Sequence, residues 1–270
     1  MRGFSYRAVY LSGVDFFRGK TKVLSDISLS VGAGELVAVM GHSGCGKTTL
    51  LELASGLLFP AKGVVEVCHR NLNFCTTTEL FRLRRQMGIL FQTGALFSDL
   101  SVFDNVAFPL RELTFLPGDA VRDLTWMKLE AVGLRSAARM FPSELSGGMA
   151  RRVALARAIA LDPRVLLCDE PFSGLDPVSV SAIAALIRSI TNIFRSATMV
   201  VTHNIGESIH IFDRIFLLIG GSLVFDGSSD EMLSSRNEMV KNFISGKFDK
   251  APSRAIPSGE ATLAENLRIS

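Results

Sequence analysis

One eight-residue segment of the chain has the residue types and spacing of a phosphate-binding loop. A triphosphate carries dense negative charge, which backbone N–H groups at a helix N-terminus can hold, and glycines let that backbone approach closely. A lysine at the end of such a loop adds a charge between the outer phosphates, and the next hydroxyl is placed to bind Mg²⁺. The segment, which we extend by one residue as a candidate nucleotide site, comprises Gly41, His42, Ser43, Gly44, Cys45, Gly46, Lys47, Thr48 and Thr49. A glycine-rich turn without function is the alternative, but the segment follows an apolar run and opens a helix-like one, as the motif requires.

A second candidate is the acidic pair Asp169-Glu170, which follows the apolar run 165–168 directly. Parallel-sheet proteins bind ligands at the carboxyl ends of such buried strands. Asp169 is then placed to orient Mg²⁺ through water, and Glu170 to polarise an attacking water as general base. An isolated Asp-Glu pair is more often a solvated turn, but the preceding strand and the following Pro171 favour a site here.

A third segment, Leu145-Ser146-Gly147-Gly148-Met149, is most informative in its spacing. Ser146 lies 99 residues after Lys47 (146 − 47) and 23 before Asp169 (169 − 146). With these three segments the chain resembles the ATP-binding cassette ATPases over about residues 8 to 245. The resemblance implies that Ser146, Gly147 and Gly148 cap a helix whose end points at the γ-phosphate of ATP bound by a second copy, whereas an ordinary N-cap is the alternative.

The same resemblance assigns two further catalytic residues. Gln92, after a predicted strand, would contact Mg²⁺ or the attacking water and form a hinge toward a membrane partner. His203 would touch the γ-phosphate and hold the water for Glu170, although an isolated histidine after a strand is more often structural. Asp176 would cross the dimer interface. The predicted catalytic residues are therefore Glu170, His203, Gln92 and Lys47, and the predicted metal ligands are Thr48, Gln92 and Asp169.

One position departs from the family pattern. The residue 29 before the loop lysine is commonly aromatic and stacks on adenine, but here it is Arg18 (47 − 29), with Phe16 and Phe17 just before it. A guanidinium plane can also stack on a base. We expect Arg18, or Phe17 shifted by one position, to take this role; a loosely held adenine is the alternative.

Apolar runs and helical stretches alternate along the chain, which predicts a mainly parallel sheet covered by helices. The resemblance makes this an α/β fold: a P-loop NTPase core with a RecA-like, mainly parallel sheet, an antiparallel β subdomain and an inserted helical subdomain at about 93–162. Residues 1–246 form this domain and 247–270 a tail that contributes little core, with a short helix at 260–267. The predicted strands are 9–11, 26–31, 36–40, 64–67, 88–91, 165–168, 198–201 and 215–219. The predicted helices are 48–58, 76–86, 121–132, 147–161, 178–194 and 206–212.

Composition restricts the function classes. Among 270 residues 48% are hydrophobic and 20% charged, which is ordinary for a globular protein. No apolar run approaches the ~20 residues that span a bilayer, and the N-terminus lacks the apolar core of a signal peptide. The four cysteines form no metal-spaced pair and predict reduced cytosolic thiols. A net charge of +3 does not suggest a nucleic-acid partner. Composition therefore predicts a soluble intracellular protein, and the family resemblance implies that it is cytoplasmic and peripheral on the cytoplasmic face of the inner membrane.

The segments 91–97 and 102–112 resemble those of the ATPases of bacterial phospholipid transporters, which maintain outer-membrane lipid asymmetry. The implied cofactors are ATP and Mg²⁺. The implied partners are a second copy in the ATP-bound state, a membrane permease, a mammalian-cell-entry (MCE) protein and a small cytosolic accessory protein, which the segment 246–270 would contact unless it packs on the neighbouring copy. A groove lined with Leu96, Phe97 and Phe103 would receive a permease helix, although about half of these apolar residues would be core.

Other functions remain to be weighed. A small-solute importer ATPase is the main alternative, and the partner permease distinguishes it. DNA-repair cassettes need an insertion for which the 99-residue spacing leaves no room, and translation-associated ones usually carry two cassettes. A purely structural subunit is disfavoured because both Glu170 and His203 are present.

Overall fold

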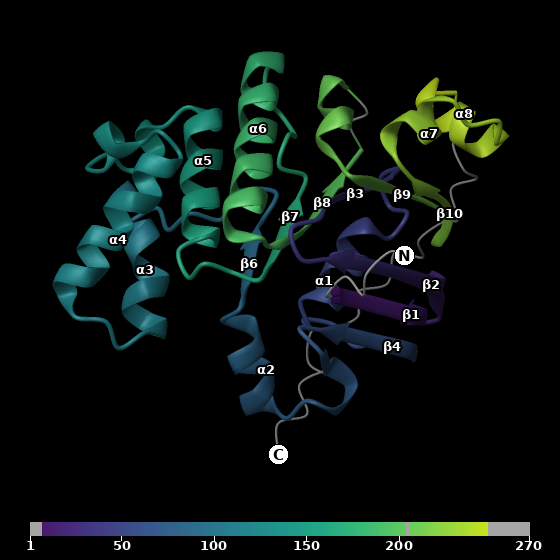
Figure 1. Ribbon diagram of the computed structural model, residues 1–270, viewed down its shortest axis with the longest axis horizontal. Coiled ribbons are helices and arrows are strands. Elements are labelled where there is room, and N and C mark those ends of the chain that lie inside the picture. The colour runs from purple at the N-terminus through teal and green to yellow at the C-terminus, as the bar shows by residue number, and fades with distance from the viewer. Residues whose placement is uncertain (1–6, 204–205, 248–270) are drawn as a thin grey trace.

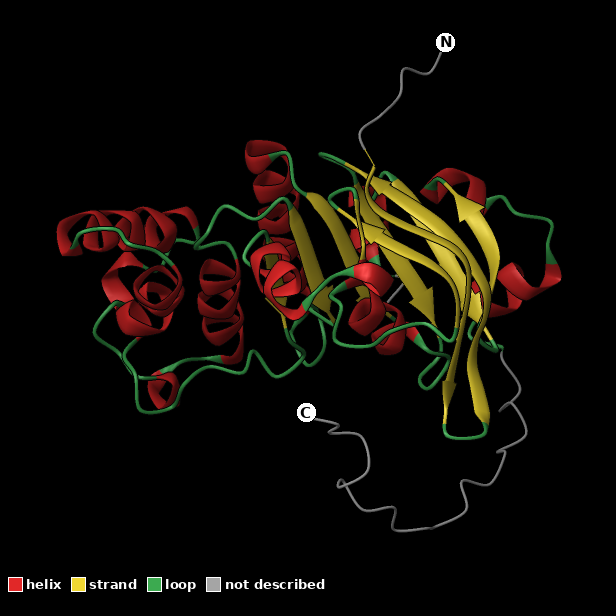
Figure 2. Cartoon of the chain, turned by 90° about the horizontal axis from the view of Figure 1, so that it is seen from below, coloured by secondary structure: helices red, strands yellow, loops and turns green. Residues whose placement is uncertain are grey.

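The computed structural model describes residues 7–203 and 206–247, and within them the chain forms two sheets that lie one over the other (Figures 1 and 2). The smaller sheet is antiparallel, in the order β2-β1-β4-β5. Its long hairpin joins two twelve-residue strands with several register shifts, which bend the pair. Its strands are β1 (Arg7–Arg18), β2 (Thr21–Gly32), β4 (Lys62–Val67) and β5 (Arg70–Asn71).

The larger sheet has the order β10-β9-β3-β8-β7-β6, and only the β10–β9 pair is antiparallel. Strands β3, β7 and β8 are buried along their whole length, as expected of central parallel strands covered on both faces. The strands are β3 (Leu36–Gly41), β6 (Met87–Leu90), β7 (Val165–Asp169), β8 (Ala197–Thr202), β9 (Arg214–Ile219) and β10 (Ser222–Gly227).

Helices cover both faces and one end of the larger sheet (Figure 1). They are α1 (Lys47–Ala54), α2 (Thr77–Arg84), α3 (Val102–Leu113), α4 (Gly118–Ala131), α5 (Gly147–Ala158), α6 (Pro177–Phe194), α7 (Ser229–Leu233) and α8 (Glu238–Ile244). Short 3-10 helices lie at Leu72–Phe74, Arg135–Ala137, Pro142–Glu144 and Glu207–Ile211.

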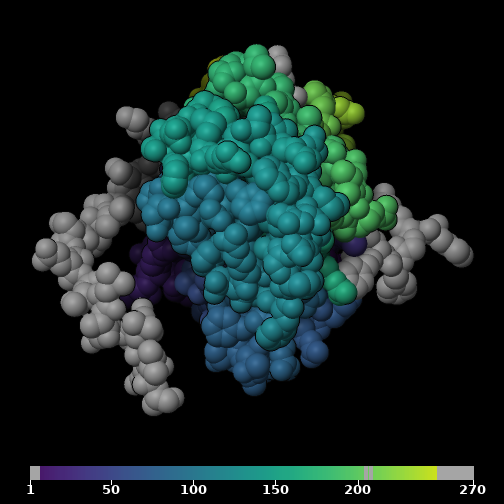
Figure 3. Space-filling model, turned by 90° about the vertical axis from the view of Figure 1, so that its left-hand side faces the viewer, coloured from purple at the N-terminus to yellow at the C-terminus, as the bar shows by residue number. Residues whose placement is uncertain are grey.

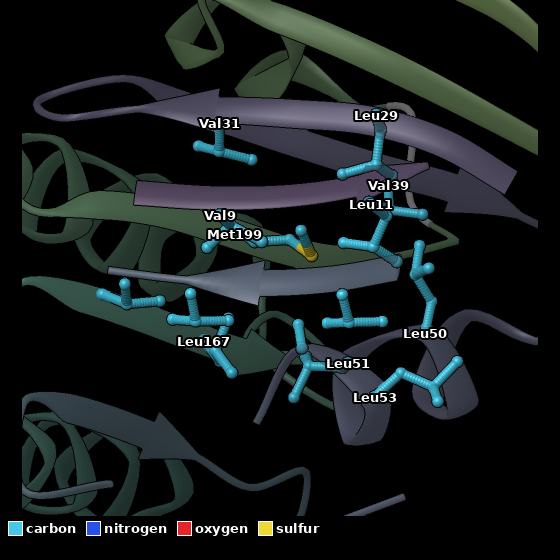
Figure 4. Close-up of a cluster of buried hydrophobic side chains, with 14 of the residues drawn as sticks. Val9, Leu11, Leu29, Val31, Val39, Leu50, Leu51, Leu53, Leu167 and Met199 are labelled. Carbon is cyan, nitrogen blue, oxygen red and sulfur yellow. The ribbon is translucent and has the colours of Figure 1, made fainter. Parts of the chain in front are cut away.

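The period of two in the strands divides the core into two layers. On β3, Val37 and Val39 join the layer that packs on the antiparallel sheet and α1, drawn in Figure 4. Met40, on the opposite face, joins the layer beneath α6. The parallel sheet is therefore the middle layer, and its strand ends meet at one edge, where the predicted site residues follow β3, β7 and β8.

The chain between β6 and β7 contains helices and no strand, and α3, α4 and α5 build one end of the molecule (Figure 3). The three helices enclose a small core of their own, including Val106, Leu129 and Val153. Trp126 of α4 packs against Phe103 of α3, with ring centroids 5.1 Å apart. The polypeptide segment that leads into this end carries Gln92.

The predicted fold class is confirmed, with both sheets and the helical segment present. Several boundaries were wrong. The first two strands are much longer than 9–11 and 26–31, since their outer halves pair only with each other. The helix after the glycine loop ends at Ala54 rather than residue 58, because Gly56 adopts a left-handed φ of 69°. The segment 206–212 forms a short 3-10 helix, and α3, α7, α8 and β10 were not predicted individually.

The described part of the chain contains one helix that bears on the expectation that no segment could span a bilayer. Helix α6 is long and apolar enough, by length and composition alone, to span a bilayer. Its inner face packs in the core through Ile183, Ile187 and Ile190, and Arg188 pairs with Asp213 at 2.9 Å. These contacts are those of a helix that covers a sheet. The signal-peptide expectation falls mostly on residues 1–6, and the tail prediction mostly on 248–270, outside the described residues.

Candidate active site

The glycine loop connects the end of β3 to the start of α1, which is the strand–loop–helix context that the sequence predicted. Gly41 has a φ of 155°, and a Cβ there would lie 2.3 Å from the Leu218 backbone oxygen, so no other residue fits. Gly46 caps α1 with a left-handed φ of 105°. Gly46 itself has no side chain to cap the helix, and N–H groups at a helix N-terminus favour a bound phosphate.

Lys47 is buried at the centre of the loop. Its Nζ donates hydrogen bonds to the backbone oxygens of Gly41 and His42, both at 2.9 Å. The same Nζ lies 3.9 Å from Glu170 Oε1. The ammonium group is therefore held between the loop and the acidic pair, where a phosphate bound to the loop would meet it.

Thr48 and Asp169 lie together beside Lys47. The Thr48 hydroxyl donates to Asp169 Oδ1 at 3.4 Å. Burial raises the pKa of Asp169, against the lowering effect of the Thr48 hydrogen bond, and the neighbouring Glu170 charge raises it further. A desolvated carboxylate and a hydroxyl are hard oxygen donors, and a divalent cation would offset the cost of burying the charge. This pair fits Mg²⁺.

Glu170 and His203 form the second half of the site. Glu170 has a φ of 45°, rare for a non-glycine residue, and its N–H donates to the Val201 oxygen at 2.9 Å. Its Oε2 lies 2.9 Å from His203 Nδ1. The imidazole is 59% exposed, whereas the carboxylate is 11% exposed. The histidine therefore projects into the opening above a carboxylate that β8 holds in place.

These groups surround a pocket of about 1300 Å³. The pocket brings together twelve of the predicted site residues: Arg18, Gly41, His42, Ser43, Gly44, Gly46, Lys47, Thr48, Thr49, Gln92, Glu170 and His203. Cys45 is buried and does not line the pocket, and Asp169 lies behind Thr48. Lining residues that the sequence did not suggest are Val23, Glu52, Gly206, Phe243, Ile244 and Gly246.

The C-terminal helix α8 forms one wall of this pocket. The Phe243 ring meets the His42 ring edge-on, with centroids 5.3 Å apart. No local signal could have identified this contact, since about two hundred residues separate the two rings (243 − 42 = 201). The contact depends wholly on how α8 packs.

Ser146, Gly147 and Gly148 do not join this pocket. Ser146 caps α5, its hydroxyl accepting from the Met149 N–H at 3.3 Å, and it is exposed. A Cβ at Gly148 would lie 3.3 Å from Ser179 Oγ, so the loop rests against the start of α6. The structure thus presents this segment on the surface of the same chain rather than to its own phosphate loop.

The two candidates for adenine stacking are separated by the structure. Arg18 lines the pocket and pairs with Glu52 at 3.6 Å, with 69% of its side chain exposed. Phe17 is not among the lining residues, and Lys22 lies over its ring at 5.9 Å. Arg18 is therefore the one of the two that faces the nucleotide pocket.

The predicted groove is only partly as expected. A groove of about 380 Å³ lies beside the Gln92 loop and is lined by Phe91, Phe97 and Phe108, with Arg157 at its wall. The rings of Phe97 and Phe108 pack at a tilt of 50°, with centroids 4.7 Å apart. Leu96 packs instead into two core clusters, and Phe103 packs on Trp126, so the prediction was wrong for these two residues.

Comparisons with known proteins agree with this geometry. Residues 24–173 match the family model described as ABC transporter. The chain is 44% identical to the intermembrane phospholipid transport system ATP-binding protein MlaF of Haemophilus influenzae, over 89% of this chain and 91% of that protein. It is 42% identical to MlaF of Escherichia coli strain K12, over 93% and 94%.

Among solved structures, cbiO1 of Clostridium perfringens, described as part of the ABC transporter complex cbiONQ, superposes with a TM-score of 0.80. The identity is 27%, over 88% of this chain and 95% of that chain. The ATP-binding cassette MJ0796, in a dimeric post-hydrolysis state bound to ADP and Pi, gives a TM-score of 0.73 at 30% identity, over 82% and 98%.

Proposed function

Because the chain belongs to the ATP-binding proteins of ABC transporters, we propose that it is the ATP-hydrolysing subunit of a complex that moves phospholipid between the inner and outer membranes. The contact of Lys47 and His203 with one buried carboxylate, Glu170, inside the nucleotide pocket carries the hydrolytic part. The lipid part is supported by the phospholipid-transport relatives, which match about nine tenths of the chain.

The residues divide the reaction among them. The loop N–H groups and Lys47 are placed to bind the phosphates, and Thr48, Asp169 and Gln92 would hold Mg²⁺. The metal would neutralise charge that develops on the phosphoryl oxygens. Glu170 accepts a proton from the attacking water.

His203 keeps Glu170 oriented through their 2.9 Å contact. Because β8 anchors the Glu170 backbone, the carboxylate needs little rearrangement to act.

A second copy of the chain completes the site. Ser146 and Gly147 lie exposed and Gly148 half-buried at the N-terminus of α5, and none of the three lines the pocket of their own phosphate loop. A helix N-terminus with free backbone donors favours phosphate. We expect these residues to reach the γ-phosphate of the partner copy, with Asp176 at the interface, as the dimeric state of the cassette MJ0796 suggests.

The remaining partners are a membrane permease, an MCE-type protein reached through the complex, and a small cytosolic accessory protein. The groove lined by Phe91, Phe97 and Phe108 suits a short permease helix, because aromatic side chains in a concave surface bind an amphipathic helix well. In this proposal the subunit lies on the cytoplasmic face of the inner membrane. ATP-driven closure of two copies would then move the permease.

Import of a small solute is the second candidate. The chain is 36% identical, over 97% of its length, to a Mycobacterium leprae protein named as a probable ribonucleotide transport ATP-binding protein. Lower identity makes it the weaker guide.

Affinity purification of the full chain from gently solubilised membranes tests the choice. A polytopic permease together with an MCE-type protein is the expected result. A permease with a solute-binding protein would move the function to import, and recovery of neither would contradict a transport role. Magnesium-dependent ATP hydrolysis by the purified chain tests the enzymatic part separately.

A further inference from the structure

Two arginines of α5 bind the backbone of the loop that carries Gln92. Arg151 Nη1 donates to the Phe91 oxygen at 3.1 Å and also to the Gln92 oxygen. Arg157 donates through Nη1 and Nη2 to the oxygens of Ala95 and Gly94, both at 2.8 Å. Four of five carbonyls between residues 91 and 95 are thus held by two guanidinium groups of one helix.

The loop backbone is shaped for these contacts. Gly94 and Ala95 both adopt left-handed conformations, with φ of 74° and 47°. Two successive residues of this kind turn their carbonyls to the same side, here toward Arg157, and the conformation is costly for alanine. A Cβ at Gly94 would lie 3.5 Å from the Ala154 Cβ, so the loop lies directly against α5.

Neither guanidinium forms an ion pair with a carboxylate in the described part of the chain. Burial lowers the pKa of both Arg151 and Arg157, and the hydrogen bonds that offset this desolvation go to backbone oxygens. A charged donor bound to a carbonyl makes a stronger hydrogen bond than a neutral one. The two guanidinium groups therefore hold the carbonyls of the Gln92 loop through charge-assisted hydrogen bonds.

Each arginine also contacts a second functional segment. Arg151 Nη2 donates to the Ser173 oxygen at 3.4 Å, in the turn that follows Glu170. Arg157 lies 5.5 Å over the Phe97 ring and lines the wall of the aromatic groove. The groove, the Gln92 loop and the turn after Glu170 thus share contacts with α5, whose N-terminus carries Ser146.

We propose that Arg151 and Arg157 are positioning residues that clip the Gln92 loop to α5, so that Gln92 enters the nucleotide pocket only when this helix is in place. The clip makes the helix with Ser146 and the loop with Gln92 move as one body. An occupant of the groove pushes on Arg157 and thereby on both. The inference rests on the proposed ATPase function for its kinetic test, but its structural test does not.

The test replaces each arginine by methionine and by lysine in the full-length chain. Methionine keeps much of the apolar stem but removes all donors, whereas lysine offers a point charge in place of the two-pronged fork. In the methionine variants we expect amide exchange of residues 93–97 to speed up at least about tenfold, which corresponds to ~1.4 kcal/mol of lost local protection.

The kinetic readout separates positioning from binding. The kcat for ATP should fall roughly tenfold in the methionine variants, while the Kd for a non-hydrolysable ATP analogue changes less than about twofold, because the phosphate loop is untouched. Lysine should restore part of kcat. Arg139→Met is the matched control: this exposed arginine lies in the same helical end and has no hydrogen bond or ion pair among described residues.

Unchanged exchange at residues 93–97 would overturn the clip. So would a parallel loss of kcat, nucleotide affinity and thermal stability with no advantage of lysine, since that pattern indicates general destabilisation. If the unmodified chain hydrolyses no ATP, the proposed function fails, and amide exchange alone decides the clip.

Discussion

The phosphate loop and the Gln92 loop both line one pocket, yet they are held in different ways. The phosphate loop is shaped by its own backbone, with glycines at Gly41 and Gly46 and a lysine that bonds carbonyls five and six residues away. The Gln92 loop is held by arginines about sixty residues along the chain. The conformation of the phosphate loop therefore depends mostly on residues within it, whereas the conformation of the Gln92 loop depends on the position of α5.

The largest expected effect is at Glu170, which lies beside Lys47 of the phosphate loop. Glu170→Gln should lower kcat by about a thousandfold, because the amide cannot accept the proton from water, while ATP binding persists. Steady-state hydrolysis and analogue binding measure the two. Wild-type turnover in this variant would remove Glu170 from the role of base. Accumulation of an ATP-bound dimer, seen by size-exclusion chromatography, is expected alongside.

Removing the loop's central charge comes next. Lys47→Ala should weaken ATP binding roughly a hundredfold, because it removes the charge-assisted hydrogen bonds to phosphate. It also leaves the Gly41 and His42 carbonyls without their donor. Titration with a fluorescent ATP analogue measures the change. Thermal stability without nucleotide serves as the control, and an unaltered affinity would contradict the assignment.

The surroundings of the Gln92 loop are tested at the aromatic groove beside it. Phe97→Asp should cut permease recovery in the purification about thirtyfold, because an aromatic anchor is replaced by a charge, with little loss of folding. Phe97 is 40% exposed. Leu96→Asp should instead destabilise the chain by about 2–4 kcal/mol, since this side chain packs into the core. Equal behaviour of the two variants, measured by melting temperature and co-purification, would refute the division.

The smallest effect concerns the base of the nucleotide. Arg18→Ala should weaken ATP binding about threefold, as expected for an exposed cation that stacks on a ring, whereas Phe17→Ala should change it less. Comparison with inorganic triphosphate isolates the base, because its binding should not depend on Arg18. If both variants bind ATP normally, adenine is held loosely.

The sequence predicted the phosphate loop better than the surroundings of the Gln92 loop, for a physical reason. A glycine loop between a buried strand and a helix is encoded within about a dozen residues, so the pattern in 36–48 carries its own context. The roles of Arg151 and Arg157 need the distance between two segments, and the sequence showed only that both arginines lie along one helix. Phe243 in the nucleotide pocket and Phe103 outside the groove have the same explanation, because their neighbours are set by packing.

Residue types and spacing by themselves determined the chemistry of this chain: a loop for phosphate, a carboxylate after a buried strand, and a signature segment at a distance that fits one family. They also determined the parallel sheet, since buried apolar strands alternate with helices. Only the tertiary structure decided which side chains share a wall. It placed Arg18 rather than Phe17 at the pocket, turned Ser146 away from its own phosphate loop, and tied Gln92 to α5. Local patterns encode backbone conformation, but contacts between distant segments depend on how the whole core packs.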